Sequence, residues 1–138
     1  MVKKRAALKG GCGKEVLILK RDLDLLRNML LRIEAAEPGR KLDVGSFADL
    51  CDDDNIIALH IELLHEAGFV KLADPYSHEI DEMAIVRMTF AGYEYLDTIR
   101  DGSNWKAIKE KLLPVGGSTS IEIVKELGVS FLRQQLGF

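Results

Sequence analysis

The amino-acid sequence predicts a mainly α, α+β fold, namely a winged helix-turn-helix with a two-stranded wing and two additional C-terminal helices. Three observations support this prediction. Residues 52–70, DDDNIIALHIELLHEAGFV, have helical spacing up to a glycine and then become strand-like. A polar, proline-containing stretch separates this strand-like run from a second one, which is typical of a hairpin. Two more helical patterns come later, with a glycine-rich break between them.

The first helix is expected to begin at Arg21, with the carboxylate of Asp22 near its positive end. It should end before Pro38, because proline disfavours helical geometry in the residue that precedes it. Leu42–Val44 then predicts a short edge strand, and Ser46–Leu50 predicts a short second helix. The apolar residues of the first helix recur at intervals of three and four, at Leu23, Leu26, Leu30 and Ile33.

The central helix ends at Gly68, and the wing follows it directly. Phe69–Leu72 and Ile85–Phe90 have the short apolar or alternating character of strands, and the polar stretch Ala73–Ala84 joins them. Thr89–Ile99 then returns to helical spacing.

The two C-terminal helices are each expected to have a capping signal and an apolar side. Ser103 is the expected N-cap of the first, and Thr119 and Glu122 have capping-box spacing at the start of the second. The apolar positions are Trp105, Ile108 and Leu112 in one helix, and Ile121, Val124, Leu127 and Phe131 in the other. We therefore expect a helical hairpin at 102–138, either packed on a winged-helix domain at 20–101 or placed at a dimer contact.

Charge is distributed very unevenly along the 138 residues. The net charge is −3, yet residues 1–21 sum to +6 and residues 43–101, with three bases against fourteen acids, sum to −11. Residues 22–42 are balanced, and residues 102–138 sum to +2. A flexible basic arm at 1–19, with several glycines and no periodicity, is thus expected to precede a strongly acidic body.

Several functional classes are disfavoured by the motifs. The fragment GCGKE resembles part of a phosphate-binding loop, but Leu8 stands where the first glycine is required and Glu15 where a hydroxyl is required. His60 and His65 are five residues apart, which does not place two metal ligands on one helix face. No catalytic signature is present, so we expect neither an enzyme nor a cofactor or metal site.

The cysteines and the apolar runs bear on the compartment. Cys12 and Cys51 lie far apart in a chain without a secretory signal, which favours two free thiols in a reducing cytosol. The apolar runs are about four residues long, far below the roughly 18 that a membrane-spanning helix needs. We therefore expect a cytoplasmic protein that does not enter a membrane.

Four segments resemble, in order, a family of uncharacterised proteins known as domain of unknown function 2513. The segments are LKRDLDLLRNMLLRIE, LHIELLHEAGFV, VRMTFAGYEYLDTIRDGSNWKAIKEKL and LRQQLGF. The resemblance covers roughly Lys20 to Phe138 and implies a winged-helix fold. Members are common in prophages and mobile elements, so it also implies such an origin, but it implies no activity, substrate or catalytic residue. Residues 1–19 depart from the pattern, because members commonly begin near KRD.

The outward side of the central helix is the expected partner face. On a helical wheel the apolar arc contains His60, which we expect to be a hydrogen-bonded core residue, and the opposite arc also includes Ala58. Asp52–Asp54 are expected to cap the helix. We expect the face to bind a protein partner or a second copy of the chain, and its candidate residues are Asn55, Leu59, Glu62, His65 and Glu66.

DNA binding through the same face is disfavoured, because base edges and phosphates call for Arg, Lys, Asn or Gln and only Asn55 qualifies. The wing likewise carries acids and no Lys or Arg. The alternative is a DNA-binding transcription regulator in which the basic arm contacts phosphates. Its candidate phosphate contacts are Lys3, Lys4, Arg5, Lys9, Lys14, Lys20 and Arg21.

Overall fold

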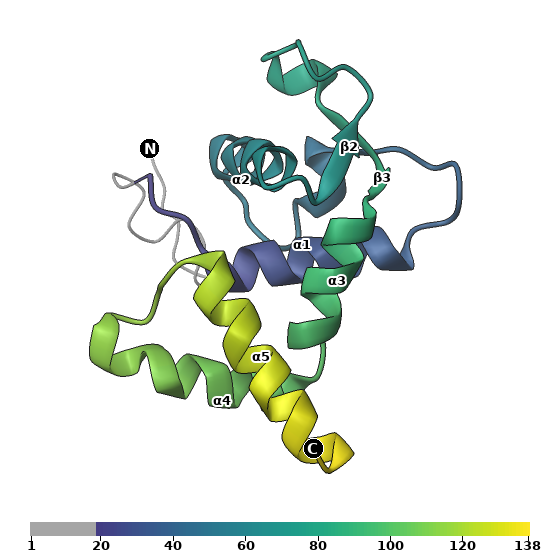
Figure 1. Ribbon diagram of the computed structural model, residues 1–138. Helices are drawn as coiled ribbons and strands as arrows, with labels where there is room; N and C mark the ends of the chain where they lie inside the picture. The colour runs from purple at the N-terminus through teal and green to yellow at the C-terminus, as the bar shows by residue number, and fades with distance from the viewer. Residues whose placement is uncertain (1–18) are drawn as a thin grey trace. The chain divides into compact units, whose positions relative to one another are not determined.

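The computed structural model describes residues 19–138, and within them the chain forms five α-helices and a small three-stranded antiparallel sheet (Figure 1). The expected mainly α, α+β class is confirmed. The chain divides into two compact units, one ending at Gly92 and one running from Tyr93 to Phe138. The expected arm, apart from its last residue Leu19, lies outside the described residues.

The first unit begins with α1, Leu23–Ala35. Asp22 is its N-cap, since the carboxylate accepts a hydrogen bond from the backbone N–H of Leu25 at 3.1 Å. The helix buries the expected apolar side, consisting of Leu23, Leu25, Leu26, Met29, Leu30 and Ile33. It ends ahead of Pro38, as predicted.

After α1 the chain forms the edge strand β1, Leu42–Asp43, and then the 3-10 helix η1, Val44–Phe47. Asp43 and Ser46 form a reciprocal capping box at the start of η1. The short helix therefore begins two residues earlier than the predicted Ser46–Leu50. The Asp43–Ser46 capping box was not predicted, and it makes the short helix begin at Val44.

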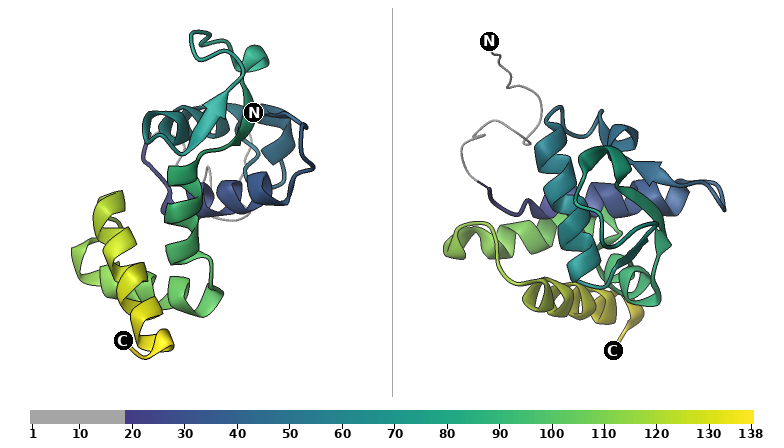
Figure 2. Two further views of the ribbon diagram at one scale, coloured as in Figure 1. Left: turned by 45° about the vertical axis from the view of Figure 1, so that its right-hand side comes forward. Right: turned by 90° about the horizontal axis from the view of Figure 1, so that it is seen from above.

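The central helix α2, Asp54–Glu66, leads into the hairpin of β2, Val70–Leu72, and β3, Ala84–Met88. Gly68 between them adopts φ +81°, a left-handed conformation that glycine accepts without strain. The sheet order is β1-β3-β2, with Leu42 and Leu72 both opposite Ile85. The long β2–β3 loop extends away from the strands and contains η2, Ile80–Glu82 (Figures 1 and 2).

Helix α3, Phe90–Ile99, crosses the boundary between the two units. It begins after Thr89, so Phe90 belongs to this helix and not to the preceding strand as predicted. The second unit then continues with α4, Gly102–Leu112, the 3-10 helix η3, Leu113–Val115, and α5, Ile121–Leu136. α4 and α5 cross obliquely within this unit (Figure 1).

Both predicted caps of the second unit are wrong by one or two residues. Asp101, and not Ser103, caps α4, and the hydroxyl of Ser103 donates to the Asp101 carboxylate at 2.8 Å, which lowers the pKa of Asp101. Ser120 caps α5 in place of Thr119. Of the expected apolar stripe of α5, Val124 is buried and Ile121, Leu127 and Phe131 are half-buried.

One cysteine differs from the sequence-based expectation. Cys51 is disulfide-bonded, so the expectation of two free thiols is wrong. The chain's other cysteine, Cys12, lies outside the described residues. Within residues 19–138, no helix combines the length and apolar character that crossing a bilayer requires.

Candidate functional site

Helix α2 is anchored from its inner side, which fixes the direction of its outer face. Ile57 and Ile61 are fully buried and Leu64 is nearly so. His60 is buried with them, and both of its ring nitrogens are satisfied. Nδ1 donates to the carbonyl of Ile56 at 2.8 Å, and Nε2 accepts from the backbone N–H of Asp22 at 2.9 Å.

The prediction of a core histidine is thus confirmed, and His60 joins the start of α1 to the middle of α2. Burial lowers the pKa of His60, and this effect outweighs the opposing influence of the Ile56 carbonyl. The neutral imidazole is the form that accepts the Asp22 N–H, so this residue is a structural link between two helices.

The five residues of the predicted partner face differ in exposure. Asn55 and Glu66 are exposed, and Leu59, Glu62 and His65 are half-buried. The Nδ1 atom of His65 is buried and has no hydrogen-bond partner among residues 19–138. All five reach the surface on one side of α2, as the helical wheel predicted.

Ala58 is a correction to the wheel. It was assigned to the outer arc, but only 6% of its surface is exposed. The 3-10 helix η1 and the β2–β3 hairpin both pack on α2, so burial extends further round this helix than a single apolar arc would require.

The β2–β3 loop adds more carboxylates beside the predicted face. Glu62 of α2 and His78 of the loop lie 3.6 Å apart between Oε2 and Nδ1, and η2 also packs on α2. The loop is ordered internally by its own polar contacts, such as the 2.6 Å hydrogen bond from the Ser77 hydroxyl to Glu82. The helix and the loop therefore present one continuous surface, which we call the acidic face and define as the exposed and half-buried side chains of residues 52–66 and 73–83.

The acidic face contains nine Asp or Glu residues and no Lys or Arg. At the N-terminus of α2, where a phosphate could otherwise dock, the Asp53 carboxylate accepts from the backbone N–H of Asn55 at 2.9 Å. The expectation that an aspartate of the Asp52–Asp54 run caps the helix is confirmed. The side chain of Asn55, the single base-reading candidate, is exposed.

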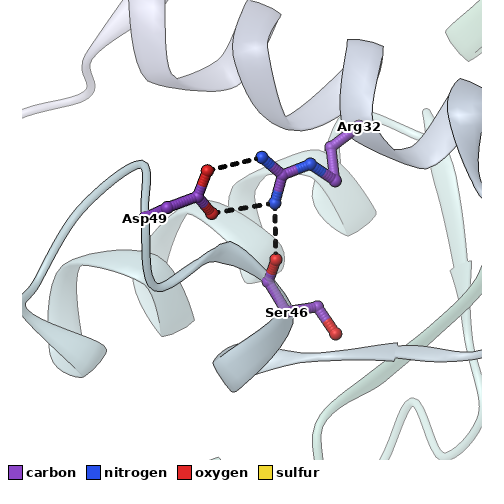
Figure 3. Close-up of polar contacts among 3 residues, drawn as sticks. All are labelled: Arg32, Ser46 and Asp49. Atoms are coloured by element: carbon purple, nitrogen blue, oxygen red, sulfur yellow. Dashed lines mark hydrogen bonds and ion pairs between the residues drawn. The ribbon is translucent and has the colours of Figure 1, made fainter.

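Arg32 fixes the segment that supports α2. Its guanidinium donates to both carboxylate oxygens of Asp49, at 3.0 and 2.8 Å, and to the Ser46 carbonyl at 2.6 Å (Figure 3). Hydrogen bonding to Asp49 raises the pKa of Arg32, and the same bond lowers the pKa of Asp49. Because η1 in turn packs on α2, this fork connects α1 to the helix that carries the candidate face.

A cationic pair lies outside the acidic face and was missed at the sequence level. Lys71 of β2 and Arg87 of β3 are opposite each other in the antiparallel register, and both are exposed. Their proximity depends on the strand register, which includes a shift between Lys71 and Leu72. Periodicity alone gave no signal for it.

The candidate phosphate contacts of the arm are only partly described. Lys3, Lys4, Arg5, Lys9 and Lys14 lie outside the described residues. Lys20 is exposed and Arg21 is half-buried just before α1. Among residues 19–138, no group of three or more His, Cys, Asp or Glu side chains is arranged to hold a metal ion.

Two comparisons with known proteins give matches. A family model described as "Hypothetical protein (DUF2513)" matches residues 20–118. A protein of Haemophilus influenzae, described as "Uncharacterized protein", is 29% identical over 121 residues, which are 86% of this chain and 99% of the relative. No solved structure matches the chain.

Proposed function

The chain belongs to the DUF2513 family, and we propose that it is a non-catalytic regulatory or accessory protein with a winged-helix fold that binds a basic protein partner through its acidic face. The observation that carries this proposal is the charge of that face, where nine carboxylates accompany no Lys or Arg.

The order of elements supports the winged-helix assignment. η1, a six-residue turn and α2 follow one another in the order expected of a helix-turn-helix, and β2 and β3 with their long loop follow in the order expected of a wing. β1 pairs with β3 at the sheet edge, so the three strands come together beside the two helices. In this assignment, the first helix of the helix-turn-helix is the 3-10 helix η1.

The acidic face supports a basic protein as the partner. Duplex DNA carries a phosphate charge every ~1.7 Å along its axis, so Glu62, Glu66 and the loop acids would oppose it. A basic protein surface would instead be attracted, and complementary charge raises both specificity and association rate. Leu59, half-buried, and Tyr76, 88% exposed, add apolar contact area to this face.

The biological setting belongs to the same proposal. The resemblance to prophage and mobile-element proteins suggests a partner that itself handles nucleic acid, since such proteins commonly have basic surfaces. The alternative, a transcription regulator that contacts DNA through Lys20, Arg21 and the rest of the basic arm, keeps the same fold but makes a different surface essential.

Affinity capture from the native host tests the proposal. The test protein carries Glu66→Lys, Glu79→Lys and Asp81→Lys, all at exposed positions of the acidic face. The matched control carries Glu94→Lys, Glu110→Lys and Glu122→Lys, which are exposed outside that face and change the net charge equally.

We expect a basic partner that the wild type and the control retain at low salt and that the face variant loses. Added salt should weaken the same interaction. A partner retained equally by the face variant would contradict the proposal. Specific duplex binding by the intact chain that is lost in a chain beginning at Lys20 would instead favour the DNA-binding alternative.

A further inference from the structure

The outward side of α5 has a pattern that packing within its own unit does not explain. The helix buries Val124 and Gly128, and Gln135 accepts from the Asn104 side chain of α4 at 3.1 Å. At 100° per residue, the opposite side of the helix presents Ile123, Glu126, Ser130 and Arg133. All four are exposed, Ile123 by 43%.

Large apolar side chains are also exposed at both ends of this helix. Ile123, in its first turn, is 43% exposed. Leu136 and Phe138, at its C-terminal end, are 72% and 84% exposed. The 16 residues of α5 separate these two apolar ends by roughly 24 Å, so neither can cover the other along one copy of the helix.

We propose that α5 pairs with α5 of a second copy in an antiparallel orientation, about a two-fold axis next to Ser130. An antiparallel orientation sets the N-terminal end of one helix against the C-terminal end of the other. The first turn of each copy, with the exposed Ile123, then lies beside Leu136 of the other, so exposed apolar residues at the two ends of the helix are covered at once.

Charge complementarity supports this partner and sets the register. Glu126 and Arg133 are seven residues apart, so they lie two turns apart on one side of the helix. An axis midway between them brings Glu126 of each copy level with Arg133 of the other. Both side chains are exposed, and neither forms an ion pair within residues 19–138. A parallel pair would instead oppose Glu126 with itself.

The remaining residues of this side agree with the same axis. Ser130 lies close to the axis, and its small side chain allows two helices to approach closely. Ile123 and the half-buried Leu127 line one edge of the interface, while Glu126 and Arg133 line the other. Because the interface is isologous, every contact occurs twice.

Light scattering on the intact protein with charge-reversed variants tests the proposal. Wild type should have twice the 15.4 kDa chain mass, whereas Glu126→Arg and Arg133→Glu should each shift toward 15.4 kDa. Like charges would then oppose each other twice in each variant, which should weaken self-association by about tenfold or more. An equimolar mixture of the two variants should regain the double mass, since each contact is again between opposite charges.

The mixture separates a lost contact from a lost fold, because a misfolded variant would not be rescued by another. A Ser130→Cys variant provides a second measurement. It should form a reducible dimer on oxidation, and Lys125→Cys, exposed on another side of α5, should not. A wild type that stays at 15.4 kDa, single variants that remain dimeric, or a mixture that remains monomeric would each overturn the proposal.

Discussion

At the residue scale, two polar side chains connect elements that lie far apart in sequence. His60 accepts a hydrogen bond from the backbone N–H of Asp22, 38 residues away, and Arg32 donates to the carboxylate of Asp49, 17 residues away. The helical wheel correctly placed His60 in the core, because its position within the apolar arc was visible in the sequence. The hydrogen-bond partners of His60 and Arg32 were not visible in the sequence, since they depend on how α1 and η1 pack against α2.

The buried His60 predicts that the stability of the fold depends on pH. Its pKa in the folded state is lowered from 6.5, so the unfolded state binds a proton more readily. The stabilisation from the buried neutral His60 is complete above pH 6.5, and it is lost as the pH falls from 6.5 through the lower pKa of the folded state. The free energy of unfolding should decrease there by up to about 1.4 kcal/mol per pH unit.

Denaturant unfolding between pH 5 and pH 8 measures this dependence. A His60→Gln variant cannot titrate at this position, so it should lose that part of the slope even though it is less stable at pH 8. His78→Gln, at an exposed position of the loop, is the control and should keep the slope. An equal slope in wild type and His60→Gln would contradict the assignment.

Arg32 predicts a change in the titration of its partner. Arg32→Lys keeps the positive charge but removes the two parallel hydrogen bonds, so the pKa of Asp49 should rise toward its ordinary value. In wild type, the stabilisation from the Arg32–Asp49 pair is present above pH 3.8. It is lost as the pH falls through the lower pKa of Asp49 in the folded state. Carboxyl NMR titration measures the shift.

Arg100→Lys is the matched control for this measurement. It alters a different exposed pair, with Asp97, and should leave the Asp49 titration unchanged. If Asp49 titrates identically in wild type and in Arg32→Lys, the fork does not control its pKa.

At the element scale, the sequence predicted where most helices and strands lie and often missed where they begin. Gly68, Pro38 and the two helical stripes after residue 100 marked real boundaries, because they act through local backbone geometry. The caps were less predictable. Asp101 and Ser103, like Thr119 and Ser120, are all capable of capping, and the choice depends on tertiary packing that spacing does not reveal.

Gly128 in the middle of α5 shows how close packing constrains an element. A Cβ added there would overlap the carbonyl oxygen of Thr98 on α3 and would lie 2.9 Å from the Thr98 Cβ. Backbone atoms cannot move aside as the end of a flexible side chain can. Gly128→Ala should therefore lower the free energy of unfolding by about 1–3 kcal/mol, although alanine is the better helix former.

Gly102→Ala provides the matched control. Gly102 begins α4, has no neighbouring atom within 4 Å of an added Cβ and does not require a positive φ. The same substitution there should be neutral or stabilising by up to about 1 kcal/mol. Thermal melting of both variants measures this difference. A melting temperature of Gly128→Ala at or above that of wild type would contradict the close contact between α3 and α5.

At the scale of the whole molecule, the uneven charge links the sequence to the proposed function. The opposition between a basic N-terminus and an acidic face was visible in the composition, because it requires only counting along the chain. That α2 and the β2–β3 loop combine into one face was not visible, since it depends on the Glu62–His78 approach and on η2 packing against α2.

The two candidate surfaces make opposite predictions for the binding of duplex DNA. Residues 1–19 carry five Lys/Arg and one acid, so a chain beginning at Lys20 has a net charge of −7 in place of −3. The shorter chain keeps the nine carboxylates of the acidic face, and it should not shift duplex DNA even at low salt, because that face repels phosphate. A mobility-shift assay with both chains over a salt series measures this.

Any shift by the intact protein should then depend on the arm and decline steeply with salt, as binding to phosphates alone does. Asn55→Ala is the informative variant of the intact protein, because Asn55 is the one residue of the acidic face suited to a base edge. It should leave such a shift unchanged. Sequence-specific binding that Asn55→Ala abolishes would show that α2 reads DNA despite its carboxylates, and the acidic face would then not be a surface reserved for a protein partner.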